Sequence, residues 1–438
     1  MSVLLSCRAP TRLRFAATLL ASATIFNAHA AAPEHETHED HAGPHFTLTE
    51  ALQRAEARHP LFASWRARDS AAEARGVQAG LRPAPELGLT IENVFGSGES
   101  SAYSGAETTL SFSQLIERGG LRDRRVDTAG AERELLTTEG EIARLDLRAE
   151  IARRFVHVLS DQAQLGITHE ATELAQGTLA EVERRVNAAR SPLAERSRAQ
   201  VTLERARLDE EHAEHELLSS RRHLAAATGS TEADFGEAEG DLLALPPVAT
   251  FEVLLTQMQA TPDVLRFASQ ARVRESELRL AQARRTPGLR VGAGVRRLEA
   301  RDDFGLVFEA SLPLFGASSE RGNVLEAEAR LAQVGPEREQ AMLKAQAQLY
   351  DVYQELNHAR VEVESQRERV VPAIEDALKQ TQIAYDRGRY SLLELRDAQT
   401  EWAAQRRRLI QAAAEFHGHL IEIQRLTGAP APNRVSHE

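Results

Sequence analysis

The chain has 438 residues, of which 42% are hydrophobic, only 5% are aromatic and one is a cysteine. Its apolar residues are mostly alanine and leucine, which favour helices, and 27% of all residues are charged. This composition is typical of long, thin helical packing rather than of a thick core rich in aromatic side chains. The net charge of −12 argues against a nucleic-acid partner. The single cysteine excludes a disulfide framework and a cysteine-rich zinc cluster.

Residues 1–30 have the features of a signal peptide. Three arginines precede an apolar run that ends at Phe26, and Ala28-His29-Ala30 supplies the small residues that a signal peptidase recognises. We expect cleavage after Ala30. The run is shorter than the roughly 20 residues that a transmembrane helix needs. Cys7 comes before the charges and the apolar run, an order that argues against lipidation.

A polar segment at 31–45 follows the predicted cleavage point, and it alternates histidines with acidic residues. Imidazole and carboxylate ligands suit zinc, cobalt, nickel and copper. We therefore predict a flexible segment that binds metal loosely, and an inert polar linker is the alternative. Its candidate ligands are His35, His38, His41 and His45.

The rest of the chain contains an internal similarity. A shift of 202 residues aligns Pro60 with Pro262, and a shift of 199 residues aligns Glu195 with Glu394. Two registers in the same order favour a duplication over chance agreement between helices of similar composition. The predicted divisions are a first structural repeat at 46–245, a second at 246–430, and a tail at 431–438.

Each repeat is predicted to begin with a helix that stops at a proline cluster, at about 47–82 and 251–285. A hairpin of two strands follows, because apolar residues alternate at period two. The alternating positions include Leu87, Leu89 and Ile91, then Leu110 and Phe112, and in the second repeat Leu289, Val291, Ala293 and Val295, then Leu306, Phe308, Ala310 and Leu312. Strands of this length cross a membrane when tilted.

A very long helix is then predicted in each repeat, at about 121–189 and 319–387, followed by a shorter helix at 192–228 and 391–427. In the second repeat, apolar residues recur every seven positions, which is coiled-coil spacing. These residues are Leu349, Leu356, Val363 and Val370. The predicted fold class is mainly α, with long helical hairpins and a small β part.

Four strands in one chain cannot close a membrane barrel, since the smallest barrels have eight and an open edge leaves backbone groups unpaired in lipid. If the strands lie in a membrane, two, three or four chains must share one barrel. The alternative is a helical protein with two exposed hairpins.

The segment from Tyr385 to Gln399 combines a tyrosine, a glycine turn and a helix start rich in Leu, Asp, Ala and Gln. Together with the other features, it resembles the TolC-like outer-membrane efflux channels over about residues 46–428. The segments Phe112 to Arg122 and Ser311 to Gly316 resemble the cobalt-zinc-cadmium resistance branch, although Leu115 stands where proline is common. The resemblance implies a homotrimer with a shared twelve-stranded barrel in the outer membrane of a Gram-negative bacterium. It also implies a helical tunnel in the periplasm.

The resemblance assigns roles to three groups of residues. Acidic residues that match the family's tunnel entrance, Glu394 and Asp397 with Glu195 as their counterpart, would form a ring that attracts cations. A solvated helix face is the alternative. The two helix turns would bind a periplasmic adaptor protein, which connects the channel to an inner-membrane pump of the RND type. These turns consist of Arg190, Ser191, Pro192 and Leu193, and of Gly388, Arg389, Tyr390, Ser391 and Leu392.

The remaining histidine pairs, His212 with His215 and His417 with His419, are predicted to lie on helix surfaces. The sequence contains no phosphate-binding loop, activated nucleophile or His-Glu-x-x-His site, so we expect neither enzymatic activity nor a cofactor. Our leading hypothesis is an outer-membrane channel that exports divalent heavy-metal cations. Two further hypotheses stay open: the same channel serving drugs or organic solutes, and a soluble periplasmic protein that buffers metal or bridges partners.

Overall fold

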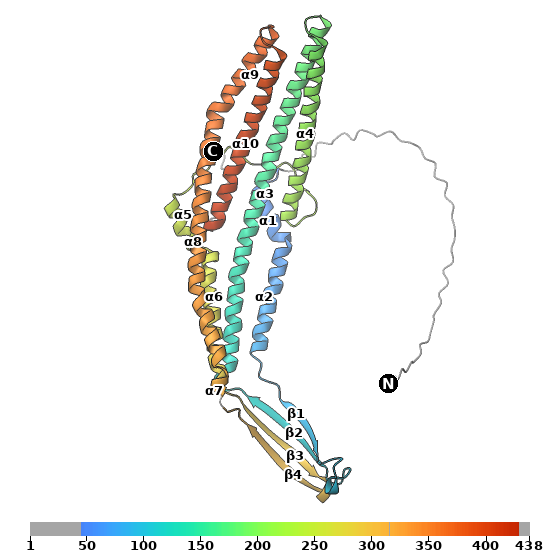
Figure 1. Ribbon diagram of the computed structural model, residues 1–438, viewed down its shortest axis with the longest axis vertical. Helices are drawn as coiled ribbons and strands as arrows, with labels where there is room; N and C mark the ends of the chain where they lie inside the picture. The colour runs from blue at the N-terminus through green and yellow to red at the C-terminus, as the bar shows by residue number, and fades with distance from the viewer. Residues whose placement is uncertain (1–44, 315, 429–438) are drawn as a thin grey trace, which may run out of the picture. The chain divides into compact units, whose positions relative to one another are not determined.

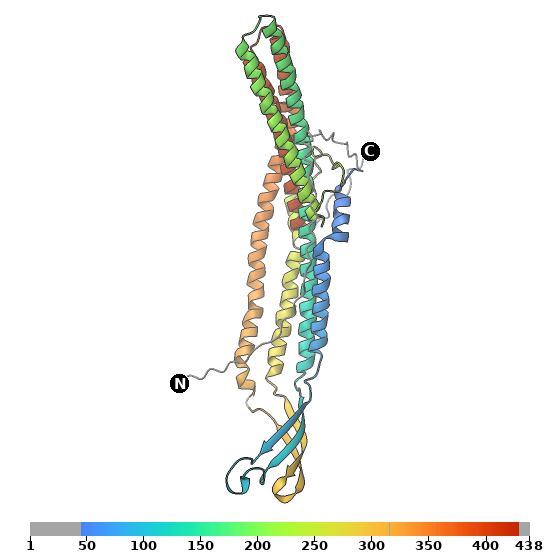
Figure 2. The same cartoon turned by 90° about the vertical axis from the view of Figure 1, so that its right-hand side faces the viewer.

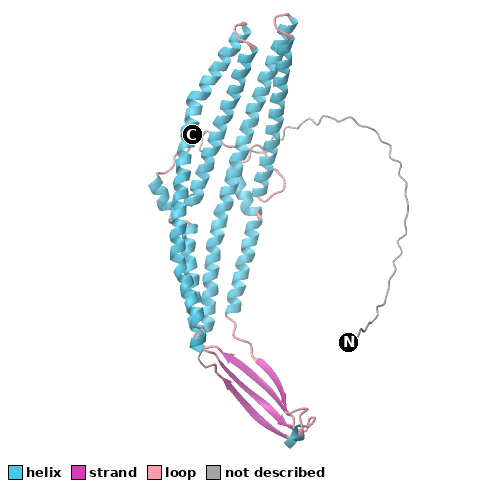
Figure 3. Ribbon diagram, in the orientation of Figure 1, coloured by secondary structure: helices cyan, strands magenta, loops and turns pink. Residues whose placement is uncertain are grey.

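Helices account for most of the residues that the computed structural model describes, which are 45–314 and 316–428 (Figures 1 and 3). All of them belong to one unit, Ala42–Glu438. The predicted signal peptide, most of the histidine-rich segment and the predicted tail lie outside the described residues.

The first half of the described residues contains four α-helices. They are α1 (Leu48–Arg58), α2 (Pro60–Ala79), α3 (Leu121–Asn187) and α4 (Leu193–Ala227). The prediction of one helix over 47–82 was wrong, because the chain breaks at His59. A residue before proline is disfavoured in the helical region, and His59 accordingly adopts an extended conformation with ψ 129°. Its ring Nδ1 accepts the Leu61 N–H (3.2 Å) and so caps α2.

The second half contains the helices α5 (Phe251–Met258), α6 (Pro262–Arg284), α7 (Gly316–Ser319), α8 (Arg321–Ser365), α9 (Val371–Asp386) and α10 (Leu392–Thr427). The predicted helix at 251–285 is broken before Pro262, where Thr261 is extended. The same constraint that applies at Pro60 explains this break.

A π-helical turn, η3 (Gln366–Val370), separates α8 from α9, so the predicted helix at 319–387 is not regular throughout. Leu349, Leu356 and Val363 are fully buried, as the seven-residue spacing predicts. Val370 is only half-buried, because the wider turn takes it out of that register.

The four strands form one antiparallel sheet in the order β1-β2-β3-β4. Their bounds are β1 (Glu86–Glu92), β2 (Glu107–Ile116), β3 (Leu289–Leu298) and β4 (Asp303–Ser311). Short 3-10 turns, η1 (Gly98–Ser100) and η2 (Glu299–Arg301), lie in the two hairpin loops. Figure 2 shows both hairpin loops at the end of the sheet that points away from the helices. The predicted alternation of apolar residues is confirmed in all four strands.

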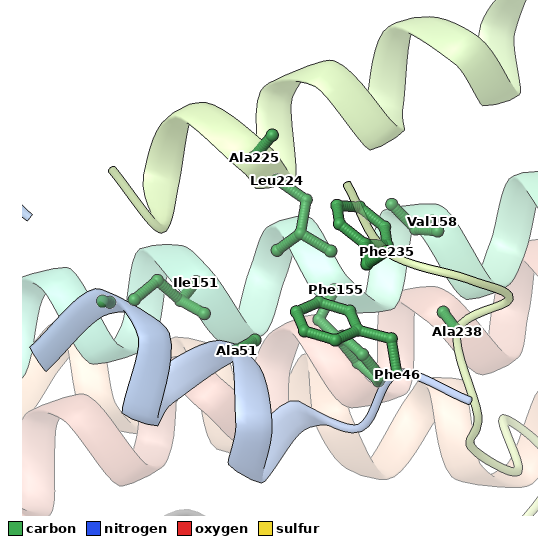
Figure 4. Close-up of a cluster of buried hydrophobic side chains, with 10 residues drawn as sticks. Phe46, Ala51, Ile151, Phe155, Val158, Leu224, Ala225, Phe235 and Ala238 are labelled. Carbon is green, nitrogen blue, oxygen red and sulfur yellow. The ribbon is translucent and has the colours of Figure 1, made fainter. Parts of the chain in front are cut away.

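A cluster of buried hydrophobic side chains ties the start of the described chain to α3 and α4 (Figure 4). Phe46 is 2% exposed and stacks on Phe235 with ring centroids 4.4 Å apart. Its N–H donates to the Glu237 oxygen (2.8 Å), and its oxygen accepts from the Glu239 N–H (3.0 Å). Burial of an aromatic ring contributes about 2–3 kcal/mol, so this contact fixes the chain just after the histidine-rich segment.

The segment 229–250, which joins α4 to α5, is held by side chains that donate to its carbonyl groups. Arg221 donates to the Gly236 oxygen (2.8 Å), and Arg360 donates to the Pro246 oxygen (2.7 Å). Charged donors make stronger hydrogen bonds than neutral ones. This irregular segment is therefore held in place against the helices on both sides.

Candidate functional site

One face of the sheet is apolar and exposed. Leu87 and Leu306 are each 74% exposed, and Phe308 is 79% exposed. The paired residues on this face are mainly aliphatic or aromatic, because alternate residues of each strand point the same way. They include Leu89, Ile91, Leu110, Phe112, Val291, Ala293, Val295 and Phe304. A continuous apolar surface of this kind marks an interaction with lipid or with protein.

The opposite face of the sheet is polar and carries two arginines, both on β3. Arg290 donates to the Glu86 carboxylate (2.5 Å) across the intervening strand. Arg296 donates to the carboxylates of Glu107 (2.8 Å) and Glu92 (3.3 Å). Along the strands, the residues of this face between the Arg290–Glu86 pair and the Arg296–Glu107 pair are mostly small, including glycines, serine and threonine. The sheet thus has one apolar face and one polar, charged face.

Both edges of the sheet are unpaired among the described residues, since β1 pairs only with β2 and β4 only with β3. Exposed N–H and C=O groups on an edge strand are ready to pair with another strand. The sheet is therefore open to extension on both sides.

At the other end of this unit, Figure 1 shows the α3–α4 turn and the α9–α10 turn. Ala189 and Gly388 adopt left-handed conformations, with φ 55° and 71°, which reverse the chain. The predicted adaptor-contact residues all lie in or beside these turns. Most are exposed, but Leu392 is only 8% exposed and packs inside the tip. Leu393, which was not predicted, is exposed in its place at 55%.

A tyrosine–arginine contact joins the two helical hairpins just below these turns. Tyr385 of α9 is 2% exposed, and the Arg185 guanidinium of α3 lies 4.0 Å from the centre of its ring. Arg185 also donates to the main-chain oxygens of Tyr385 (2.9 Å) and Asp386 (3.2 Å). Burial raises the pKa of the Tyr385 hydroxyl. The sequence contained both residues, but nothing in it indicated that they meet.

The three predicted entrance carboxylates have different surroundings. Glu394 forms a capping box at the start of α10, where its carboxylate accepts the Ser391 N–H (2.6 Å) and hydroxyl (2.9 Å). Asp397 is 64% exposed at its side chain and lies 3.2 Å from Arg396. Glu195 is half-buried in the first turn of α4. The structure therefore gives Glu394 a role in stabilising the turn, and the entrance ring stays a prediction.

A groove of about 840 Å³ runs between α4 and α10, above small residues of α3. Asp397 contributes to one wall, and Arg198 and Arg205 of α4 contribute to the other. Ala175 and Thr168 lie in its floor. This mixture of charges suits water and ions better than an apolar ligand.

Of the predicted metal ligands, His45 is described and is exposed next to Phe46, whereas His35, His38 and His41 lie outside the described residues. Within 45–314 and 316–428, no three histidine, cysteine or acidic residues form a group that could hold a metal ion. The metal-binding segment stays a prediction.

The predicted surface position of His417 was wrong. His417 is half-buried, and its Nε2 donates to the Leu242 oxygen (3.0 Å). Burial lowers the pKa of its imidazole. By contrast, His212 is exposed and pairs with Glu216 (3.3 Å), and His215 is also exposed. His419 is half-buried. His417 faces segment 229–250, whose position could not be read from the sequence of α10.

Comparison with known proteins identifies the family of this chain. The sequence matches the family described as outer membrane efflux protein over residues 51–230 and 256–429. The chain belongs to this family. The efflux protein is 27% identical to the cobalt-zinc-cadmium resistance protein CzcC of Cupriavidus metallidurans, over 88% of this chain and 91% of that protein. It is 26% identical to the nickel-cobalt-cadmium resistance protein NccC of Alcaligenes xylosoxydans xylosoxydans, over 68% of this chain and 69% of that protein.

Solved structures share the fold of the efflux protein. A membrane protein from Pseudomonas aeruginosa superposes with a TM-score of 0.73 at 18% identity, covering 87% of this chain and 92% of that one. The outer membrane protein VceC of Vibrio cholerae superposes with a TM-score of 0.69 at 19% identity, covering 87% and 96% of the two chains. Among the described helices of the efflux protein, none combines the length and apolar content needed to cross a bilayer.

Proposed function

We propose that this efflux protein is the outer-membrane channel of a tripartite system that exports divalent heavy-metal cations such as cobalt, zinc, cadmium or nickel. The observation that carries the proposal is the alignment of nearly the whole chain with CzcC, a protein named for resistance to three of these metals. The named resistance of NccC to nickel, cobalt and cadmium supports the same substrate class.

In this proposal three chains share one barrel of twelve strands in the outer membrane. The two unpaired edge strands support a shared barrel, because β1 of one chain would pair with β4 of the next. The apolar face of the sheet would contact lipid, and the polar face would line the conduit. The helices of the three chains would together enclose a tunnel in the periplasm. Substrate passes through this path without chemical change.

A periplasmic adaptor protein would bind the two helix turns and connect them to an inner-membrane pump of the RND type. The exposure of Leu193 (65%), Tyr390 (47%) and Leu393 (55%) supports this role, because apolar side chains at a projecting turn offer a contact surface. The pump would supply the energy. Near the same turns, Glu394, Asp397 and Glu195 would contribute negative charge to the entrance.

Cell fractionation and ion flux test the proposal. We expect the protein in the outer-membrane fraction as an oligomer that survives detergent on an unheated gel, and we expect purified trimers to carry cobalt or zinc ions across liposomes. Recovery in the soluble periplasm without such an oligomer would support a metal-buffering or bridging protein instead. Removing residues 34–45 tests the histidine-rich segment separately, since full retention of metal resistance would make it a linker.

A further inference from the structure

The polar face of the sheet carries more carboxylates than arginines. The five carboxylates and two guanidiniums give this face a net charge of −3 per chain. Its charged residues are Glu86, Glu92, Glu107, Asp303 and Glu309, with Arg290 and Arg296. Strand register places all seven on one side, because alternate residues face the same way.

Arg296 of β3 lies at the centre of the charge network near the hairpin loops. Glu92 and Glu107 face each other across β1 and β2, a like-charged pair that destabilises a sheet when unmatched. The Arg296 guanidinium donates to both, and its Nε also donates to the Thr109 hydroxyl (2.9 Å). Two carboxylates against one guanidinium leave this level of the sheet with a net negative charge.

The carboxylates on β4 have no such partner. Among the described residues, neither Glu309 nor Asp303 forms an ion pair, and both are exposed. Arg290, the other cation of this face, is already bound to Glu86. Both cations of the face are thus engaged by carboxylates, and the free charge on it is negative.

Small residues keep the space between the two charged levels open. A hollow of about 120 Å³ lies between Arg296 and Glu309 and is lined by Ser111 and Gly294 among others. A Cβ atom on Gly294 would lie 2.7 Å from the Leu110 oxygen of the neighbouring strand, so a larger residue does not fit there without displacing the backbone. The hollow leaves room for hydrated ions beside the carboxylates.

We propose that this polar face determines cation preference within the membrane part of the channel, and that Arg296 acts as a bound counter-ion for Glu92 and Glu107. The inference rests on the proposed function, in which this face lines the conduit. With Arg296 engaged, the face repels anions and attracts cations. Its charge acts in addition to the carboxylates near the helix turns.

Bilayer recordings test the inference, using purified trimers in a KCl gradient to obtain the ratio of potassium to chloride permeability. We expect Glu92→Gln with Glu107→Gln to lower this ratio about threefold or more, because Arg296 is then unmatched, and Arg296→Gln to raise it about twofold. Arg297→Gln is the matched control. Arg297 is the next residue along β3, lies on the apolar face and pairs with Glu299 (2.8 Å), so its replacement should leave the ratio unchanged.

The outcomes separate the inference from the proposed function. If the trimers conduct but Arg296→Gln leaves the ratio unmoved, or moves it no more than Arg297→Gln does, the polar face does not set cation preference. If folded trimers do not conduct at all, the channel function itself fails and the inference fails with it. Should the double carboxylate variant not assemble on an unheated gel, the opposite shift expected for Arg296→Gln still decides the question.

Discussion

Replacing Glu394 and Asp397 with the corresponding amides separates the proposed entrance charge from the structural role of Glu394. Glu394→Gln with Asp397→Asn removes two negative charges per chain. Glutamine at this position preserves the capping box, because its side-chain oxygen can still accept the Ser391 N–H that Glu394 accepts at 2.6 Å. We therefore expect the free energy of unfolding to change by less than about 0.5 kcal/mol, while the charge is lost.

The magnitude of the electrical effect follows from the position of these groups. Asp397 is 64% exposed at its side chain, so solvent and salt screen each charge, and one charge about 10 Å from the ion path contributes about 0.4 kcal/mol before screening. A trimer loses six such charges, which together contribute about 2.4 kcal/mol, and screening at about 0.1 M salt reduces this to about 0.9 kcal/mol. The loss should therefore lower the potassium-to-chloride permeability ratio about fourfold or more. The assay is the reversal potential of single channels in planar bilayers.

Two controls make this result interpretable. Glu394→Ala removes the cap as well as the charge and should cost about 1 kcal/mol of stability. Glu375→Gln with Asp376→Asn removes an exposed acidic pair from the second turn of α9. If the entrance variant leaves the ratio unchanged, or the α9 variant lowers it equally, then Glu394 and Asp397 do not line the entrance.

Three further predictions concern the packing of the helices. Arg425 donates to Asp263 (2.7 Å) and Asp146 (2.5 Å). Arg425→Met should lower the free energy of unfolding, measured with guanidinium chloride at fixed protein concentration, by about 2 kcal/mol. Arg148→Met removes an exposed ion pair and should lower it by less than about 1 kcal/mol. Equal losses would show that the Arg425 ion pairs contribute no more than an exposed one. Phe46→Ala should cost about 3 kcal/mol and speed proteolysis before α1, and an unchanged cleavage rate would contradict the role of Phe46. For two histidines the pH dependence should have opposite signs. Burial lowers the pKa of His417, so its contribution to stability is present above its unfolded pKa and is lost as the pH falls below that value. A hydrogen bond with Glu210 raises the pKa of His169. The contribution of His169 to stability is therefore present at low pH and is lost as the pH rises through its folded pKa. Between about pH 7.5 and 5.5, the thermal midpoint of His417→Gln should fall less than that of the wild type and the midpoint of His169→Gln should fall more; the reverse order would refute the assignment.

The strands and the long helices could be predicted from the sequence because each follows a simple period. Alternation at period two placed all four strands, and the spacing of Leu349, Leu356 and Val363 indicated a buried seam. The breaks before Pro60 and Pro262 were missed, since a proline is tolerated in the first turn of a helix as well as disruptive inside one. The π-helical turn has no periodic signal of its own.

The site was predictable only in part. The turns were placed correctly, but Leu392 belongs to their interior. The capping box could have been read from the spacing of Ser391 and Glu394, which would have indicated a structural role for that carboxylate. The contact between Arg185 and Tyr385 joins residues far apart in the chain, and no local pattern encodes it.

Growth of a deletion strain tests the central claim most directly. The gene is removed from its host, and tolerance to zinc, cobalt, cadmium, nickel and copper is compared with tolerance to a panel of drugs, with the intact gene restored as the control. We expect lower tolerance to at least one of zinc, cobalt, cadmium and nickel, restored by the gene, and unchanged tolerance to the drugs. Unchanged metal tolerance together with increased drug sensitivity would contradict the proposed function.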